Sequence, residues 1–388
     1  MVNRPHPFSP RIALRNNPCR QISQAHWPVK SQPEERHPRK IFYAFDPAAD
    51  KPTSNIFEFL DPGTISQSPE YQHALSIPPT SLHVPWPTSL PCSLQSKHWQ
   101  TAETAARAYT HGILHHDSQN PTFQKKIDTL IDTAVSYAVN LVPLSNPTRM
   151  HLLTKTFILL FLHDDAADAG TSANDTIIPT KSEHTIEESQ HPAYTILARE
   201  FLTEDIIQGQ QVLNEIISWA TITQNAQTIP KSFQNIDEYF VHAVPDFGAT
   251  LILHTVEFSI GVNLTFQERQ SVSGLEALCA KHLLLTNDLY SYAKEVTAEG
   301  GIVLNAVRVV EDLLDVSASS AASILRSLIR ELESEMDKEY SRLEQMQQVT
   351  QPQLLYAQAI IVAAAGNMFF SATCPRYARV VEGSKLLL

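Results

Sequence analysis

Apolar side chains recur at helical spacing along most of the chain after residue 93, where strand-like alternation is nearly absent. Pro121 precedes the first clear apolar stripe and Pro143 ends it. The stripe consists of Ile127, Leu130, Ile131, Ala134, Val135 and Ala138. A second helix over residues 148–168 is rich in Leu and Phe and ends in acidic residues. The same spacing predicts helices over residues 192–223, 233–261, 266–295, 303–314, 318–348 and 352–372. We therefore expect an all-α fold.

The first 93 residues differ from this pattern because they contain 16 of the 25 prolines. Proline fixes its own φ angle and restricts the residue before it, so the stretch favours extended, irregular chain. The first 33 residues carry four Arg, one Lys and no acid, yet their prolines exclude a continuous amphipathic targeting helix. We predict a Pro-rich, largely irregular N-terminal arm over residues 1–93, disordered at its start, and one helical domain over residues 94–388.

The chain carries 41 acidic and 29 basic side chains, a formal net charge of -12. This balance argues against a nucleic-acid partner but allows a phosphorylated small substrate where metal ions supply positive charge. We see no apolar run long enough to span a bilayer and expect no stable membrane insertion. The four cysteines are too scattered for a zinc site and indicate a reduced, cytoplasmic protein: Cys19, Cys92, Cys279 and Cys374. The oligomeric state stays open, and a homodimer is compatible with the sequence.

The most informative stretch contains Asn287, Ser291 and Glu295, which recur at i, i+4 and i+8. On a helix this spacing places the three side chains in one column. An amide, a hydroxyl and a carboxylate form an all-oxygen ligand set, which suits Mg²⁺ better than zinc. Lys294 projects close to the column, where an ammonium can contact a metal-bound phosphate and stabilise a leaving anion. The alternative is a polar helix stripe that binds no ligand.

A second acidic group closes the helix that ends at residue 168. Asp164 and Asp168 share one helix face, and Asp165 lies about 100° round the axis. Residues 157–162 before them are apolar on every side, so the carboxylates lie at the negative end of a buried helix. Their mutual repulsion is costly without a counter-cation, which favours a metal site over an acidic helix end that frays into solvent. We interpret His163 as a hydrogen-bonded neighbour and not as a ligand.

Three motifs resemble, in the same order, those of fungal class I terpene synthases: Asp164-Asp165-x-x-Asp168, Asn287-Asp288-x-x-Ser291-x-x-Lys294-Glu295 and Arg376-Tyr377. The first is similar to the aspartate-rich motif of that family. The second matches its other metal motif at every defining position. The third resembles the Arg-Tyr pair of the fungal members, and residues 366–370 before it are also similar to that group. The resemblance covers about residues 95 to 385, which is the whole helical part.

The resemblance implies a class I terpene synthase helical barrel around a central apolar pocket, with residues 94–388 as the catalytic domain. It also implies a Mg²⁺ cluster that binds the diphosphate of an isoprenyl substrate, for which farnesyl diphosphate is the first choice. The metal ligands it implies are Asp164, Asp165, Asp168, Asn287, Ser291 and Glu295. The diphosphate contacts it implies are Asn287 and the catalytic residues Lys294, Arg376 and Tyr377.

The reaction implied by these parts is ionisation of the diphosphate ester, followed by cyclisation of the allylic carbocation to a sesquiterpene hydrocarbon or alcohol. Water would quench the cation, so the pocket must be dry, and aromatic faces can stabilise the moving positive charge. Each aromatic candidate is by itself also consistent with core packing. The candidates are Phe157, Phe161, Phe247, Phe369 and Phe370.

One position departs from the family pattern. The family segment that aligns with residues 238–248 normally carries a diphosphate-sensing arginine, and Ala243 stands at that position. Asp246, three residues later, is kept. The missing guanidinium removes a bidentate phosphate contact, for which His242 is an available substitute. Either another cation recognises the diphosphate on this side, or closure of the pocket is triggered differently.

Three other hypotheses remain open on the sequence alone. A chain-elongating prenyltransferase should carry a second aspartate-rich motif where residues 287–291 stand. An HD-type metal phosphohydrolase is prompted by His163-Asp164 and the 16 histidines, but it gives the column at residues 287–295 no role. A non-catalytic helical protein is prompted by Ala243.

Overall fold

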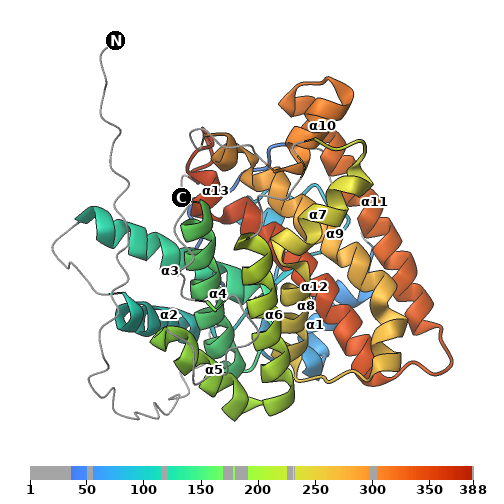
Figure 1. Cartoon of the computed structure of the whole chain (residues 1–388). Coiled ribbons are helices and arrows are strands. Elements are labelled where there is room, and N and C mark those ends of the chain that lie inside the picture. Colours follow the sequence, from blue (N-terminus) through green and yellow to red (C-terminus); the bar gives the residue numbers. More distant parts are fainter. Residues whose placement is uncertain are drawn as a thin grey trace.

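The computed structural model describes residues 36–49, 56–114, 121–168, 178–179, 191–224, 230, 232–297 and 304–386, and it confirms the all-α fold (Figure 1). The helices of the main body are α2 (Trp99–Ile113), α3 (Pro121–Leu141), α4 (Pro147–Asp168), α5 (Pro192–Glu204), α6 (Ile206–Gln224), α7 (Ile236–Phe247), α8 (Ala249–Ile260), α9 (Phe266–Thr297), α10 (Ala306–Leu314), α11 (Ala318–Glu344), α12 (Gln351–Thr373) and α13 (Pro375–Ala378). Strands within the described ranges are limited to β1 (Ala74–Ile77) and β2 (Ser93–Ser96), which pair antiparallel.

Helix α12 is the central element and packs against α9, α3, α8 and α11 (Figure 1). All its side chains from Tyr356 to Thr373 are buried except Gln358. Contrary to our expectation from the sequence, the stretch Gln351–Ala378 is long and apolar enough to cross a membrane. However, 83% of its apolar window is buried inside the fold, which is the environment of a core helix.

The contact between α12 and α3 depends on a glycine. A Cβ built on Gly366 would lie 1.9 Å from the backbone oxygen of Asn140. The Asn140 amide nitrogen donates to the Ser136 carbonyl at 2.7 Å, and its amide oxygen accepts from Gln95 at 3.0 Å. The two helix backbones therefore touch more closely than any side chain at residue 366 would allow.

The predicted helix over residues 192–223 is in fact two helices, so the prediction of a continuous helix is wrong. Asp205 adopts an extended backbone, with φ -155° and ψ 108°, and ends α5. Its carboxylate accepts from the backbone N–H groups of Ile207 at 3.1 Å and Gln208 at 3.0 Å. A side chain that satisfies the first free N–H groups favours a new helix start, and α6 begins there.

The predicted helix over residues 233–261 is also broken, at Gly248 between α7 and α8. Gly248 has a φ of 79°, which is the left-handed conformation that glycine adopts without a steric cost. A Cβ at this position would also lie 2.8 Å from the ring of Trp219. The break turns the chain so that α7 and α8 contact α9 as separate helices.

The described part of the first 93 residues packs on the helical body as short elements. They are η1 (Glu58–Leu60), α1 (Pro62–Gln67), η2 (Pro69–Tyr71), β1, η3 (Pro79–Leu82) and the start of β2. Within residues 36–49, the Asp46 carboxylate accepts from Arg326 of α11 and from the Tyr290 hydroxyl of α9, each at 2.7 Å. The side chains of Asp46 and Arg326 are 0% and 1% exposed. Separating such a buried pair is costly, so the ion pair fixes this segment against α11, and the Tyr290 hydrogen bond adds a contact to α9.

Candidate active site

Arg376 joins the acidic group on α4 to the C-terminal end of the chain. One terminal nitrogen of its guanidinium lies 3.1 Å from an oxygen of Asp164 and 2.6 Å from an oxygen of Asp165. Burial of Arg376 opposes its charge, but the carboxylates of Asp165 and Asp164 raise its pKa above the ordinary value. Arg376 is therefore a fixed cation that offsets the repulsion between the two aspartates. The side chain of Asp168 lies outside the described residues.

Tyr377, the next residue along the chain, contacts the other metal motif. Its hydroxyl oxygen accepts from the amide nitrogen of Asn287 on α9 at 2.9 Å. Burial raises the pKa of Tyr377, so its hydroxyl keeps a proton that can be donated to a third group. Two consecutive residues, Arg376 and Tyr377, thus bring the three sequence motifs together at one end of the helical body.

The predicted column on α9 exists, and each of its side chains has a polar partner. The amide nitrogen of Asn287 is taken by Tyr377, which leaves the amide oxygen available as a ligand. The hydroxyl of Ser291 donates to Glu295 at 2.5 Å, which leaves the lone pairs of that hydroxyl available. The other carboxylate oxygen of Glu295 accepts from Asn305 at 3.0 Å. Lys294 is half-buried in the last turn of the same helix.

These donors fit a hard divalent cation. The column offers a neutral amide oxygen, a hydroxyl oxygen and a carboxylate, and the α4 side offers two further carboxylates that are about half-exposed. Among the described side chains, no group of three or more His, Cys, Asp or Glu could hold an ion by itself. Asn287 and Ser291 add neutral oxygens beside the carboxylate of Glu295, and their role as metal ligands remains a prediction.

Asp288 belongs to the second motif but faces away from the column. Its carboxylate accepts from the Tyr239 hydroxyl of α7 at 2.5 Å and from the backbone N–H of Ala306 at 3.0 Å. Burial, followed by the nearby charge of Glu295, raises the pKa of Asp288 well above its usual range. The residue therefore ties α7 and α10 to α9. Sequence reasoning missed this role, and the only local signal was its offset of about 100° from Asn287.

Three of the five predicted pocket aromatics belong to one cluster around Tyr137 of α3. The Tyr137 ring lies 4.8 Å from Phe157, 5.7 Å from Phe161 and 4.8 Å from Phe370, measured between ring centroids. Phe370 also lies 6.0 Å from Tyr377, and the guanidinium of Arg376 lies 5.6 Å from the Phe161 ring. The cluster therefore connects the apolar interior with the charged end of the site. Sequence reasoning missed Tyr137, although it lies three residues after Ala134 of the apolar stripe.

The other two predicted aromatics have different surroundings. Phe369 lies 6.5 Å from Trp86 of the N-terminal segment, on another face of α12 from Phe370. Phe247 is the last residue of α7 and is half-buried beside the break at Gly248. All five predicted aromatics remain predictions as substrate contacts.

Ala243, which replaces the family arginine, is buried in α7. It stands four residues after Tyr239, so the two residues share the helix face that contacts α9 through Asp288. His242 lies on a neighbouring face, with its ring 6.1 Å from that of Phe233. Asp246 accepts from the Trp219 indole through its backbone oxygen at 2.9 Å.

His163 does not join Asp164 in a ligand pair. Its ring is 2% exposed, lies 5.1 Å from the Trp219 ring and is hydrogen-bonded to Thr223 through Nε2 at 3.0 Å. Burial lowers its pKa to about 4. This placement gives no support to a His-Asp phosphohydrolase centre.

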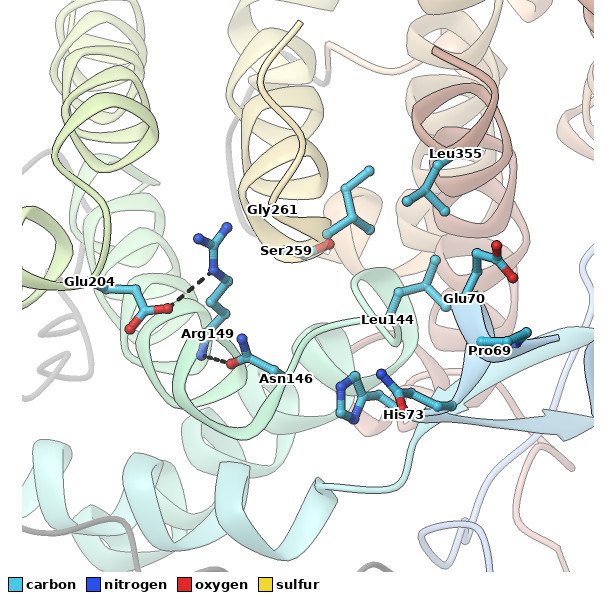
Figure 2. Close-up of a pocket in the computed structure, with 12 residues that line it drawn as sticks. Pro69, Glu70, His73, Leu144, Asn146, Arg149, Glu204, Ser259, Gly261 and Leu355 are labelled. Atoms are coloured by element: carbon cyan, nitrogen blue, oxygen red, sulfur yellow. Dashed lines mark hydrogen bonds and ion pairs between the residues drawn. The ribbon is translucent and has the colours of Figure 1, made fainter. Parts of the chain in front are cut away.

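A cavity of about 320 Å³ lies at the other end of the helical body (Figure 2). Its lining includes Glu70, His73, Asn146, Arg149, Glu204, Ser259, Gly261 and Leu355. Fifteen residues separate Arg149 from Asp164 on α4, or about 22 Å along the helix. Arg149 is already paired with Glu204 at 3.2 Å and Asp205 at 3.1 Å, so this cavity is a poor match for a diphosphate.

Comparisons with known proteins agree with this geometry. The sequence model of the family described as "Terpene synthase family 2, C-terminal metal binding" matches residues 155–335. Terpene cyclase 6 from Gibberella fujikuroi is 32% identical over 322 residues, covering 79% of this chain and 86% of the relative. Terpene cyclase aneC from Aspergillus aculeatus is 28% identical over 369 residues, covering 89% of this chain and 83% of the relative. The crystal structure of aristolochene synthase from Penicillium roqueforti matches with a TM-score of 0.61 and 21% identity, covering 74% of this chain and 98% of that one.

The family match contains both metal motifs, and the longer pairwise matches extend beyond it at both ends of the helical body. The solved structure supports the class I terpene synthase fold. The relatives are named as terpene cyclases, which favours a cyclase over a prenyltransferase or a phosphohydrolase. The chain belongs to the terpene synthase family.

Proposed function

We propose that this terpene synthase is a Mg²⁺-dependent cyclase that ionises farnesyl diphosphate and closes the allylic cation to a sesquiterpene hydrocarbon or alcohol. The observation that carries the proposal is the bridge made by Arg376 to the acidic group of α4 and by Tyr377 to Asn287 of α9. A diphosphate at this bridge would face ligand oxygens from both helices. Sequence relatives named aristolochene synthase, from Aspergillus terreus and Penicillium roqueforti, are 27% and 26% identical, which supports a farnesyl substrate.

Different residues of the chain would bind the metal and the diphosphate. Asp164 and Asp165 on one side, and Asn287, Ser291 and Glu295 on the other, would hold Mg²⁺, which neutralises the diphosphate and favours its departure. Arg376 would contact the diphosphate as a fork of N–H donors beside its aspartates. The Tyr377 hydroxyl accepts a hydrogen bond from Asn287, so its own O–H group would donate a hydrogen bond to a diphosphate oxygen.

The aromatic cluster would guide the cation once the diphosphate has left. Its rings lie on α3, α4 and α12 and extend inward from Arg376 and Tyr377. Their faces can stabilise positive charge without offering a nucleophile, and their bulk excludes water that would end the reaction early. The shape of this wall would therefore select how the chain folds before ring closure.

The test is incubation with farnesyl diphosphate and Mg²⁺, followed by gas chromatography and mass spectrometry of the extract. We expect cyclic C15 products from the wild type and a loss of at least about 100-fold in rate for Glu295→Gln. Glu331→Gln, at an exposed position of α11, is the matched control and should behave as the wild type. Geranyl and geranylgeranyl diphosphate test the chain length. No cyclic product from any of the three substrates would refute the proposal.

A further inference from the structure

Asn305 contacts the second metal motif but belongs to none of the three sequence motifs. It is the N-cap of α10 and is fully buried, with 0% of its surface exposed. Its amide oxygen accepts from the backbone N–H of Val307 at 2.8 Å. Its amide nitrogen donates twice, to the backbone oxygen of Asp288 at 2.9 Å and to the carboxylate of Glu295 at 3.0 Å. One side chain thus joins the start of α10 to two positions on α9.

The orientation of this amide follows from its partners. The Asp288 carbonyl and the Glu295 carboxylate are both acceptors, and the Val307 N–H is a donor. A flipped amide would place oxygen against both acceptors and nitrogen against the donor. Serine or aspartate could cap α10 as well, but neither can donate to two acceptors. A side chain that only caps the helix could therefore not make all three hydrogen bonds of Asn305.

The contact with Glu295 bears directly on the predicted ligand column. Glu295 lies in the last turn of α9, where the negative end of the helix dipole disfavours a carboxylate. One of its oxygens accepts from Ser291 at 2.5 Å and the other from Asn305 at 3.0 Å. These two donors offset the unfavourable position and restrict the rotation of the carboxylate. A ligand held in this way loses less freedom when it binds a cation.

Asp288 anchors the start of α10 and so fixes the position of Asn305. Its carboxylate accepts from the N–H of Ala306, the residue after Asn305, at 3.0 Å. It also accepts from Tyr239 of α7 at 2.5 Å, so the start of α10 is held against α9 by a buried carboxylate. This anchor places the Asn305 amide within reach of Glu295.

We propose that Asn305 is a positioning residue, which holds the Glu295 carboxylate in place for the cation and so sets the cation affinity of the second motif. The proposal rests on the proposed function, because it concerns the same cation site. Among the predicted ligand side chains, Asn305 contacts Glu295 directly, since the other two hydrogen bonds of the amide go to backbone atoms.

The test compares Asn305→Ser with Asn235→Ser. Asn235 caps α7 by accepting from the backbone N–H of Glu238 at 2.9 Å, and serine caps about as well as asparagine, so both variants keep a cap. Isothermal titration calorimetry measures the binding of inorganic diphosphate at a series of Mg²⁺ concentrations. We expect Asn305→Ser to raise the Mg²⁺ concentration at which half of the protein binds diphosphate by about 10–100-fold. Asn235→Ser should stay within about twofold of the wild type. Asn305→Asp keeps the cap but adds a carboxylate beside Glu295, so its loss should be larger.

A double-mutant cycle separates positioning from folding. Glu295→Asp shortens the side chain by one methylene and withdraws the carboxylate from Asn305. Adding Asn305→Ser to Glu295→Asp should then change the Mg²⁺ requirement by no more than about twofold. Circular dichroism and thermal unfolding check that each variant is folded.

Two outcomes overturn the proposal: an unchanged Mg²⁺ requirement in both Asn305 variants, or an equal loss in the Glu295→Asp background. Failure of the proposed function is distinguishable from both. In that case the wild type itself would bind no diphosphate with Mg²⁺ and would form no product from farnesyl diphosphate.

Discussion

Replacing Gly366 with alanine tests how α12 and α3 come together beside the site. The new Cβ would lie 1.9 Å from the backbone oxygen of Asn140, whereas ordinary contact begins at 3.4 Å, so the helices must separate locally by about 1.5 Å. Asn140 cannot yield easily, because its side chain is hydrogen-bonded to Ser136 and Gln95. Overpacking against backbone costs about 3 kcal/mol, which exceeds the gain of about 1 kcal/mol from replacing a helical glycine. We expect a net destabilisation of about 2 kcal/mol or more.

The assay is urea unfolding followed by circular dichroism, with Gly112→Ala as the matched control. Gly112 lies in α2, and a Cβ there would meet no atom within 4 Å. Only the helix-propensity term then applies, so the control should be stabilised by up to about 1 kcal/mol. The two alanine variants should therefore shift the unfolding midpoint in opposite directions.

The same substitution should reach the site, because Phe370 follows Gly366 by one helical turn and its ring lies 4.8 Å from Tyr137 of α3. Separating α12 from α3 would loosen that contact and lower the rate of product formation. A Gly366→Ala protein as stable as Gly112→Ala to within about 0.5 kcal/mol would refute the close-approach argument.

Two further predictions concern charges near the site. In Arg376 a single guanidinium nitrogen contacts both Asp164 and Asp165, which leaves the other N–H donors for the diphosphate. Arg376→Lys keeps the charge but loses this planar set of donors, so kcat/KM for farnesyl diphosphate should fall about 10–100-fold in steady-state kinetics. A change below threefold would contradict the assigned role. Burial lowers the pKa of His163 to about 4, so the unfolded chain binds the proton first as pH falls and stability is lost between about pH 6.5 and 4. His163→Gln should make that loss shallower in thermal unfolding, relative to His37→Gln at an exposed histidine, and an unchanged profile would contradict the argument.

The sequence predicts the long helices well where one apolar pattern runs without interruption. Helix α4 ends at Asp168 as expected, and α9 and α12 lie within two residues of their predicted bounds. The breaks at Asp205 and Gly248 were missed because apolar periodicity continues across both, and only the local backbone shows the change. Helix α2 was missed because its buried side combines three alanines with two threonines, Thr101 and Thr110, so its apolar signal is weak; the alanines are Ala102, Ala105 and Ala106.

For the candidate site, the sequence likewise predicts the residues that share one helix but not their contacts with other helices. The column of Asn287, Ser291 and Glu295 follows from helix geometry alone, because all three positions belong to one uninterrupted helix. Their partners could not be derived from spacing. Tyr377 lies 90 positions after Asn287, and Asn305 contacts Glu295 across the turn into the next helix. Such contacts depend on how helices pack, which short-range periodicity does not specify.

The residues around Ala243 show which side of the site lacks the family arginine. Tyr239 and Ala243 share a face of α7, and the hydrogen bond from Tyr239 to Asp288 shows that this face is turned toward the second metal motif. The family arginine would therefore approach the site from α7, whereas alanine at this position reaches nothing charged. Recognition of the diphosphate then depends more strongly on the guanidinium of Arg376 in α13. This is the reason we expect Arg376→Lys to be costly here: no guanidinium at residue 243 is present to compensate for the lost fork.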